Sequence, residues 1–327
     1  MTLPRRRFLR LAMSAAALPV LARTAIAQGY PARPITMIVP FPAGGANDVI
    51  ARIVAERMRE PLGQRIVIEN VGGADGSIGV GRLARARPDG YTICLGIDGS
   101  FVLNGAFYSL PYDLLNDFSP ITLVASGPVV LMGRTTLPAK DLGELIAWLK
   151  AHPGQASAGM NTLGFRLLAA RFQQQTGTQF TIVPYRAAPA AIEDLVAGRI
   201  DLVFGTLTSH LPQLRAGREK AYAVVDEQRS ALAPDIATFA EAGLPALTYT
   251  NWYGLFAPKG LPKDIVAKLN MAVVEALADP AVRSRLSEVG YEVFPRERQT
   301  PEALAALQKA DAAKWWPVIR ELGLKAE

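Results

Sequence analysis

The stretch ITMIVPFPAGGANDVIARIVAERM, residues 35–58, decides the fold class of this chain of 327 residues. Its beginning, at 35–41, is an apolar and largely β-branched run, as in strands that are buried on both faces. A turn rich in proline and glycine follows, and either Asn47 or Asp48 then caps a helix whose apolar side chains recur on one face. A buried strand followed directly by an amphipathic helix predicts a parallel α/β sheet.

The same alternation continues through the rest of the chain. Further strand-like runs are RIVIEN (65–70), YTICLGI (91–97), ITLVAS (121–126), VVLMGR (129–134), TIVPYR (181–186), IDLVFG (200–205) and AYAVVD (221–226). Helical patterns occur between them, for example at 142–151 and 189–198, and a final helix is expected at 301–323, kinked or broken near Pro317. About 300 residues exceed what one hydrophobic core usually serves, so we expect two α/β lobes. No flexible linker is present, which favours strand-like crossovers between the lobes.

Residues 1–27 are typical of a bacterial export signal. They contain five arginines and no acidic residue, an Ala/Leu-rich run at 11–22, and small residues at both positions that a signal peptidase recognises before Gln28. The apolar run is too short for a membrane-spanning helix, which needs about 20 residues. The run RRRFLR at 5–10 is similar to the twin-arginine export motif, although the Sec route stays open. The cleavage site disfavours a basic helix belonging to the fold, and we expect cleavage near Ala27–Gln28 and a periplasmic protein.

Composition excludes several classes of function. Five of the 35 basic residues and none of the 29 acidic residues lie in 1–27, so the rest of the chain is nearly neutral. No later stretch combines basic and aromatic residues, and we therefore expect no nucleic-acid partner. The one cysteine, Cys94, lies in an apolar run and cannot form an internal disulfide. With two histidines beside it, the chain has too few ligands for a usual zinc site, and we expect neither metal nor cofactor.

The loop PFPAGGAND at 40–48 is the strongest candidate for a ligand site. Its two adjacent glycines let the backbone approach a ligand closely. The helix that follows offers free N–H groups and the positive end of its dipole, which together bind anions without a basic side chain. An ordinary strand-to-helix turn explains the local pattern equally well.

Motifs for catalysis are weak. The pattern G-x-G-x-x-A at 79–84, with Asp98 after the next strand, outlines a dinucleotide fingerprint, but a long loop separates it from the preceding strand. The run DGSIG at 75–79 lacks the first glycine of a nucleophile elbow. Neither His152 nor His210 has a neighbouring pattern of a catalytic triad. We therefore predict that the protein is not an enzyme, and we retain an exported Rossmann-type oxidoreductase only as an alternative.

A set of sequence blocks, in order and with characteristic spacing, covers nearly all of the chain after residue 27. The blocks are YPARPITMIVPFPAGGANDVIAR (30–52), RPDGYTICLG (87–96), LPYDLLNDFSPITLVAS (110–126), TIVPYRAAPAAIEDLVAGRIDLVF (181–204), LAPDIATFAEAGLP (232–245), WYGLFAPKGLP (252–262) and LADPAVRSRLSEVG (277–290). Together they resemble the Bug family, the TctC-like periplasmic solute receptors of tripartite tricarboxylate transporters.

The resemblance implies a type II periplasmic-binding fold, in which two α/β lobes close on a ligand cleft like a Venus flytrap. Residues 28–127 and 252–327 would form one lobe, and residues 128–251 the other. The resemblance places the two crossovers near 125–130 and 248–254.

The resemblance also implies a function. Such a receptor captures a small organic carboxylate and delivers it to an integral-membrane permease, as a monomer and without a cofactor. Some receptors of this type instead present their ligand to a membrane-bound sensor kinase, and this alternative stays open. In the family, backbone groups and bridging waters hold the ligand carboxylate.

Matching positions imply contact residues in both lobes. They are Phe41, Pro42, Ala43, Gly44, Asp48, Asp98, Gly99 and Ser100 in one lobe, and Met160, Asn161, Thr162, Tyr185, Arg186, Ala187 and Gly205 in the other. Asp48 has a second interpretation as a helix-start residue stabilised by the dipole. Many relatives carry an acid where this chain has Gly205, so we expect a weaker preference for ligands that bear an ammonium group. Many also carry a histidine where this chain has Phe165 or Arg166, and a glycine at Ala187.

Overall fold

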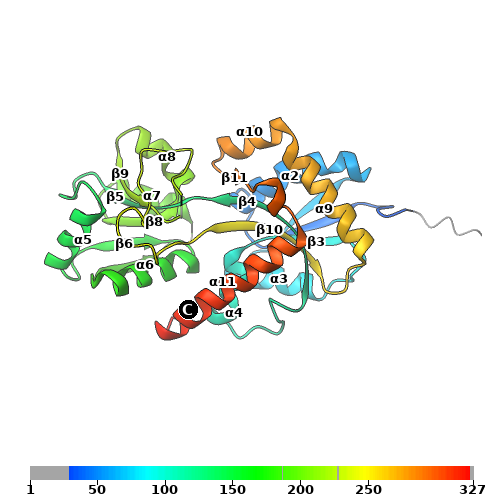
Figure 1. The fold of residues 1–327 in the computed structure, drawn as a ribbon, viewed down its shortest axis with the longest axis horizontal. Coiled ribbons are helices and arrows are strands. Elements are labelled where there is room, and N and C mark those ends of the chain that lie inside the picture. Colours follow the sequence, from blue (N-terminus) through cyan, green and yellow to red (C-terminus); the bar gives the residue numbers. More distant parts are fainter. Residues whose placement is uncertain (1–28, 186, 227, 325–327) are drawn as a thin grey trace, which may run out of the picture.

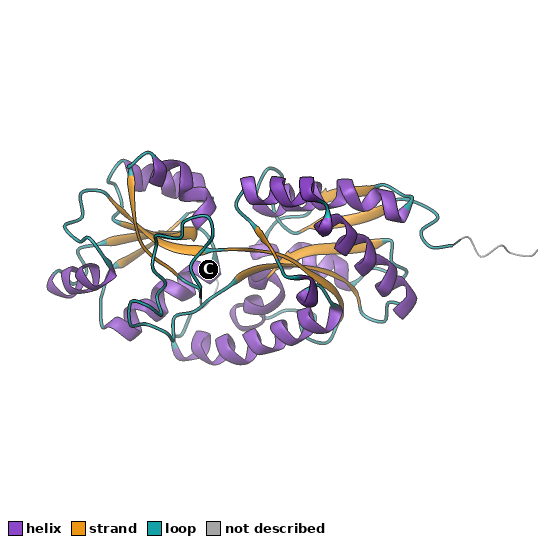
Figure 2. Ribbon diagram, turned by 45° about the horizontal axis from the view of Figure 1, so that its top comes forward, coloured by secondary structure: helices purple, strands orange, loops and turns teal. Residues whose placement is uncertain are grey.

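The computed structural model describes residues 29–185, 187–226 and 228–324, so the export signal expected at 1–27 lies outside the described residues. Within this part the chain forms two β-sheets with helices packed against them (Figure 1; Figure 2). We call the six-stranded sheet with its helices the first lobe and the five-stranded sheet with its helices the second lobe. The arrangement confirms the predicted two-lobe α/β class.

The first-lobe sheet has the strand order β11-β4-β10-β3-β1-β2. Its strands are β1 (Ile35–Val39), β2 (Ile66–Asn70), β3 (Thr92–Ile97), β4 (Phe118–Gly127), β10 (Asn251–Pro258) and β11 (Glu292–Val293). β1 runs parallel to β2 and β3, whereas β10 is antiparallel to β3 and β4. The apolar run that opens the deciding stretch therefore lies between two parallel neighbours, as its pattern predicts.

The second-lobe sheet has the strand order β7-β6-β8-β5-β9. Its strands are β5 (Val129–Arg134), β6 (Ser157–Met160), β7 (Thr181–Pro184), β8 (Leu202–Thr206) and β9 (Glu219–Val224). β6 runs parallel to β7 and β8, and β5 is antiparallel to β8 and β9.

The helices divide between the lobes. In chain order they are α2 (Ala46–Leu62), η1 (Ala74–Gly76), α3 (Ser77–Ala84), the π-helix η2 (Gly99–Leu103), α4 (Asn104–Phe107), α5 (Leu142–Ala151), α6 (Leu163–Thr176), α7 (Ala188–Val196), α8 (Leu207–Arg215), α9 (Lys263–Ala278), α10 (Pro280–Glu288), η3 (Arg296–Arg298) and α11 (Pro301–Glu321). In the part of the chain that the structure describes, no helix has both the length and the apolar character needed to cross a membrane.

Helix α11 is continuous through Pro317, whereas the sequence predicted a kink or break there. Proline removes one backbone hydrogen bond of a helix, but packing can hold the surrounding turns in place. Trp315 and Ile319, on either side of the proline, are both buried in the core.

Two extended connections lie side by side where the lobes meet (Figure 1). β4 passes into β5 with only Pro128 between them. β10 begins at Asn251, which pairs with Gly127 at the end of β4. Both connections therefore belong to one hydrogen-bonded strand pair.

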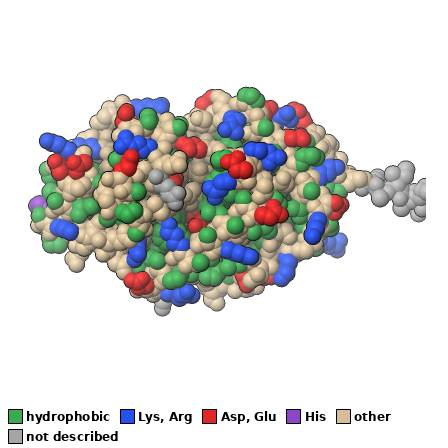
Figure 3. Space-filling view, in the orientation of Figure 1, with side chains coloured by type: hydrophobic (Ala, Val, Ile, Leu, Met, Phe, Trp, Pro, Cys, Tyr) green, Lys and Arg blue, Asp and Glu red, His purple; other side chains and the backbone are tan. Residues whose placement is uncertain are grey.

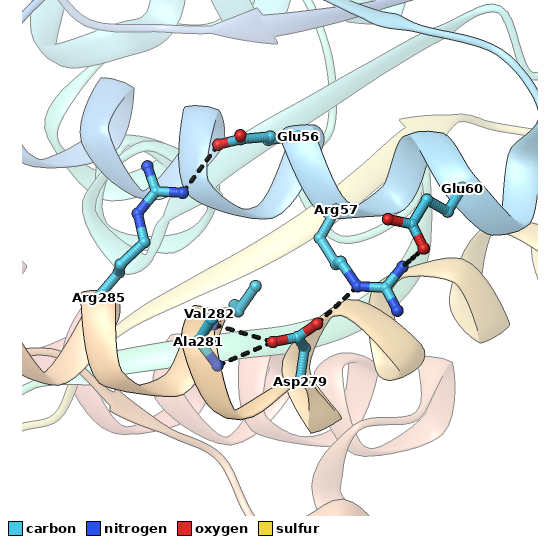
Figure 4. Close-up of polar contacts among 7 residues, drawn as sticks. All are labelled: Glu56, Arg57, Glu60, Asp279, Ala281, Val282 and Arg285. Atoms are coloured by element: carbon cyan, nitrogen blue, oxygen red, sulfur yellow. Dashed lines mark hydrogen bonds and ion pairs between the residues drawn. The ribbon is translucent and has the colours of Figure 1, made fainter.

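Ion pairs fix the direction of α2 against α10 (Figure 4). The Arg57 Nε atom lies 2.7 Å from Asp279 Oδ2, and the Arg285 Nη1 atom lies 2.8 Å from Glu56 Oε2. Asp279 also caps α10, because its Oδ1 atom accepts from the Ala281 N–H at 2.8 Å. Partly exposed pairs of this kind contribute about 0–1 kcal/mol each, so they orient the helix more than they stabilise it.

The core of the first lobe contains a close aromatic stack. The rings of Phe101 and Phe256 lie 3.8 Å apart and nearly parallel, and both are fully buried. Gly96 of β3 makes room for this stack, since a Cβ atom there would lie 2.1 Å from a Phe101 ring carbon.

We predict that Gly96→Ala lowers the free energy of unfolding by about 1–3 kcal/mol, because the added methyl group overpacks the core. Gly143→Ala is the matched control, since Gly143 is exposed in α5 and its Cβ would have only an ordinary contact. Urea denaturation measures both variants, and an unchanged midpoint for Gly96→Ala would contradict the close packing.

Candidate functional site

A cavity of about 760 Å³ lies between the two lobes. The first lobe lines it with the loop 41–45, the start of α2 and residues of η1 and η2, and the segment 249–253 lines it where the lobes meet. The second lobe lines it with the segments that begin α6, α7 and α8. The cavity is therefore built mostly from strand ends, loops and helix starts of both lobes.

The loop between β1 and α2 forms one wall. Gly44 has a φ of +80°, in the left-handed region that favours glycine, and a Cβ atom there would meet no atom within 4 Å. Gly45 is the N-cap residue of α2, and because glycine has no side chain, no side-chain hydrogen bond caps this helix. The loop thus brings backbone to the cavity surface with open space in front of Gly44.

The buried carboxylate of Asp48 holds this loop. Its Oδ2 atom accepts from the Gly44 N–H and from Arg52 Nε, each at 2.9 Å, and its Oδ1 atom accepts from Asn70 Nδ2 at 3.1 Å. The hydrogen bond from Arg52, helped by those from Gly44 and Asn70, holds the pKa of Asp48 below its usual value. Asp48 does not line the cavity, so in this structure it orders the turn and the helix start.

Among the described segments that line the cavity are the N-terminal ends of four longer helices. They are the starts of α2, α6, α7 and α8. Thr162 caps α6 by accepting from the Phe165 N–H at 3.2 Å, whereas the caps of the other three helices make no side-chain hydrogen bond. First-turn N–H groups have no acceptor inside their own helix, and each helix start carries a partial positive charge. Their arrangement favours a bound anion.

The wall combines apolar side chains with hydroxyl and amide groups, and it is almost uncharged. Asp75 is the one charged residue among the described residues that line the cavity. Hydroxyl and amide groups come from Asn47, Asn104, Asn161, Thr162, Thr206, Thr208, Ser209, Tyr249, Asn251, Tyr253 and Tyr291. On the outer face shown in Figure 3, acidic and basic side chains are interspersed, as expected for a nearly neutral chain. In the described part of the chain, no three His, Cys, Asp or Glu side chains are placed to hold a metal ion.

The structure brings together many of the residues expected from the sequence. Phe41, Pro42, Ala43, Gly44, Gly99, Asn161, Thr162 and Ala187 all line the cavity. Arg186 lies outside the described residues. Whether these residues contact a ligand remains a prediction.

Other expected contact residues point away from the cavity. Ser100 is fully buried, and its hydroxyl donates to the Ile97 carbonyl at 3.1 Å. The Tyr185 hydroxyl donates to Asp194 Oδ2 at 2.6 Å, within the second lobe. Met160, at the end of β6, is buried in the core. Their strands end near the cavity, but hydrogen bonding and burial direct these side chains inward.

Gly205 also lies outside the cavity wall. A Cβ atom at this position would lie 2.5 Å from His210 Nε2, so the imidazole fills the space that a side chain would need. His210 is itself buried, and its Nδ1 atom lies 2.8 Å from Glu219 Oε2. Because Gly205 does not line the cavity, the lack of an acid at this position says nothing about the charge of the cavity wall.

Asp98 is the most unusual of these groups. It is buried, and its carboxylate accepts from Asn251 Nδ2 at 2.7 Å and from the Tyr249 hydroxyl. Burial raises the pKa of Asp98 to about 7, and the nearby Asp311 acts in the same direction. Because Tyr249 and Asn251 line the cavity, Asp98 positions the wall without touching the open space.

Part of the wall comes from residues that no pattern in the sequence marks as ligand-facing. Tyr249, Tyr253 and Tyr291 come from segments more than 200 residues after the first loop in the chain, and no local motif marks them. Asp75 and Asn104 lie near the second glycine cluster and η2, where Asp75 appeared only as part of a failed nucleophile motif.

Comparisons with known proteins agree on one family. The model of the tripartite tricarboxylate transporter family receptors matches residues 50–324. Among curated relatives, BugT of Bordetella pertussis is 35% identical over 319 residues, which cover 96% of this chain and 95% of BugT.

Solved structures give the same result. The periplasmic binding protein BugD is 35% identical and superposes with a TM-score of 0.79, covering 91% of this chain and all of BugD. MatC from Rhodopseudomonas palustris with bound malate is 35% identical, with a TM-score of 0.79 and coverage of 89% and 100%. Rpa4515 of R. palustris with adipate is 32% identical, with a TM-score of 0.80 and coverage of 90% and 99%.

We predict that Asp98→Asn makes stability less dependent on pH. The raised pKa of Asp98 means that its protonated form stabilises the fold fully below about pH 4, and that this contribution is lost as the pH rises towards 7. Asparagine does not ionise, and its Oδ1 atom can accept from Asn251 Nδ2 while its Nδ2 group donates to the Tyr249 hydroxyl oxygen. From pH 5 to pH 7.5 the free energy of unfolding of the natural chain should therefore fall by about 2–3 kcal/mol more than that of the variant.

Urea denaturation at several pH values measures the effect. Asp235→Asn serves as the control, because it removes an exposed carboxylate that makes no hydrogen bond within the described chain. Parallel stability curves for the natural chain and Asp98→Asn would show that Asp98 does not titrate in this range.

Proposed function

We propose that this chain, which belongs to the tripartite tricarboxylate transporter receptor family, captures a small organic carboxylate between its lobes and delivers it to a membrane permease. The family model and the structural neighbours are those of solute-binding receptors, so the chain is a receptor and not an enzyme. Membership of this family also implies a periplasmic location. The carboxylate class and the permease are our inferences.

The observation that carries the proposal is the convergence of four helix starts on a cavity whose described lining contains no lysine or arginine. Each helix start presents backbone N–H groups and about half a positive elementary charge. A carboxylate accepts several hydrogen bonds, and the N–H groups and neighbouring hydroxyls supply donors from both lobes.

The neighbours support a dicarboxylate or similar acid as ligand. MatC was solved with malate, and Rpa4515 with adipate. A cavity of about 760 Å³ is larger than such acids need, so ordered water and closure of the lobes would complete the contacts.

The ligand would contact the cavity-lining residues that the sequence predicted. They are Phe41, Pro42, Ala43, Gly44, Gly99, Asn161, Thr162 and Ala187. The lobes would comprise residues 28–127 with 252–327, and 128–251, after removal of residues 1–27. Ligand bridging two lobes favours their closed arrangement, because contacts to both lobes exist only when they approach.

We predict that one or more of succinate, malate, adipate, citrate and benzoate binds in isothermal titration and leaves no product. A bound acid should reduce the radius of gyration in X-ray scattering. It should also raise the free energy of unfolding by about 2.7 kcal/mol at a hundredfold excess over Kd. A tight ligand that leaves the scattering curve unchanged would rule out closure, and turnover of the acid would rule out a simple receptor.

We predict that Gly44→Val weakens binding of that acid at least tenfold, because a β-branched side chain would enter the cavity and resist the left-handed backbone. Gly63→Val is a closely matched control. Gly63, at the other end of α2, has a φ of +64° and equally open space, but it does not line the cavity. The two variants should lose similar stability in thermal melts, and equal affinities would argue against a ligand at the 41–45 loop.

A further inference from the structure

We infer that Asp75 and Asn104 form a subsite for a ligand amino group, so that the receptor selects acids that carry an ammonium group as well as carboxylates. The inference rests on the proposed function, since it concerns a second region of the same cavity. It assigns ligand specificity to the first-lobe wall.

The backbone at Asp75 is strained. Ala74 and Asp75 have φ values of +46° and +49°, in the left-handed region that most residues avoid. Such a conformation costs about 1–2 kcal/mol for a residue other than glycine. Ala74 is exposed and Asp75 is half-buried, so hydrophobic burial does not account for the strain. Strained backbone is concentrated at sites that bind or react, where the surrounding structure holds it in place.

Only one of the two carboxylate oxygens of Asp75 accepts a hydrogen bond within the described chain. Its Oδ2 atom accepts from the Tyr108 hydroxyl at 2.8 Å, and its Oδ1 atom has no partner among the described residues. Burial and the hydrogen bond to Asp75 raise the pKa of Tyr108, so the phenol stays protonated and keeps donating. One carboxylate oxygen is therefore fixed, and the other remains available to the cavity that Asp75 lines.

Asn104 provides the second acceptor. Its side chain is fully buried, and its Nδ2 atom donates to the Asp75 carbonyl at 3.0 Å and to Ser77 Oγ at 2.9 Å. A carbonyl oxygen only accepts, so the amide nitrogen must face Asp75 and the Oδ1 atom must face away. Within the described chain this oxygen has no hydrogen-bond partner, and Asn104 also lines the cavity. A buried acceptor without a donor costs about 1–3 kcal/mol, which a ligand donor would offset.

The two regions of the cavity therefore differ in charge. The helix starts provide donors and positive potential, whereas the wall at Asp75 and Asn104 provides acceptors and a negative charge. An ammonium group fits this wall best, because it combines a positive charge with three donors. Arg166 of α6 lowers the pKa of Tyr108 electrostatically, so it reduces the negative potential, but it does not line the cavity.

This assignment replaces the expectation drawn from Gly205. That expectation assumed that an acid for an ammonium group would stand after β8 in the second lobe. The structure places Gly205 against His210, outside the wall, and places an acid on the opposite lobe. The charge that selects an amino group is therefore present, although at another position.

Isothermal titration with succinate, malate and aspartate tests the subsite, because these acids differ only in a hydrogen, a hydroxyl or an amino group at one carbon. The natural chain should bind aspartate at least tenfold more tightly than succinate. Asp75→Asn should remove most of this preference by weakening aspartate binding, and it should not weaken succinate binding, because succinate loses only the repulsion of the Asp75 carboxylate. Asparagine tolerates the left-handed backbone and still accepts from Tyr108, so the variant should fold, which a thermal melt checks. The control Asp235→Asn removes an exposed acid and should preserve the preference.

Three results would overturn the inference while leaving the receptor function intact. The first is that the natural chain binds succinate as tightly as aspartate or more tightly. The second is that it binds malate more tightly than aspartate. The third is that Asp75→Asn lowers the affinity for all three acids by the same factor. If none of these acids and none of the wider panel bound, the proposed function would fail, and the subsite with it.

Discussion

The buried carboxylate of Asp48 is the contact on which the ligand-facing part of the first lobe depends. It accepts hydrogen bonds from the turn at Gly44, from Arg52 one helical turn further along α2, and from Asn70 at the end of β2. One side chain thereby ties a loop, a helix and a strand together. Without it, the Gly44 N–H would lack an acceptor and the start of α2 would lose its anchor.

Backbone and side chains have separate tasks in the cavity. Backbone N–H groups at helix starts do not change when a side chain is substituted, so they provide a constant environment for a negative charge. Apolar side chains, hydroxyls, amides and Asp75 line the remaining surface. A receptor of this design can change its ligand by altering a few wall residues while keeping the turn that Asp48 holds.

Sequence reasoning succeeded where the information was local. The β1–α2 unit followed from hydrophobic periodicity, and its loop lines the cavity as expected. The family was also identified correctly from its sequence blocks. A position at a strand end, however, does not fix where a side chain points, and Asp98 and Met160 turn into the interior. Tyr249 and Tyr291 reach the cavity only through tertiary folding, and the left-handed turn at Asp75 lacks the glycine that would have signalled it.

The pairing of β4 with β10 at the lobe junction has a mechanical consequence. Because Gly127 and Asn251 are direct partners, both chain crossings lie close to one line. The proposed closure would then turn the lobes about this line, and differently shaped solutes would drive them along a common path. A membrane protein that recognises the outer surface would then meet one loaded shape, whichever solute the interior carries.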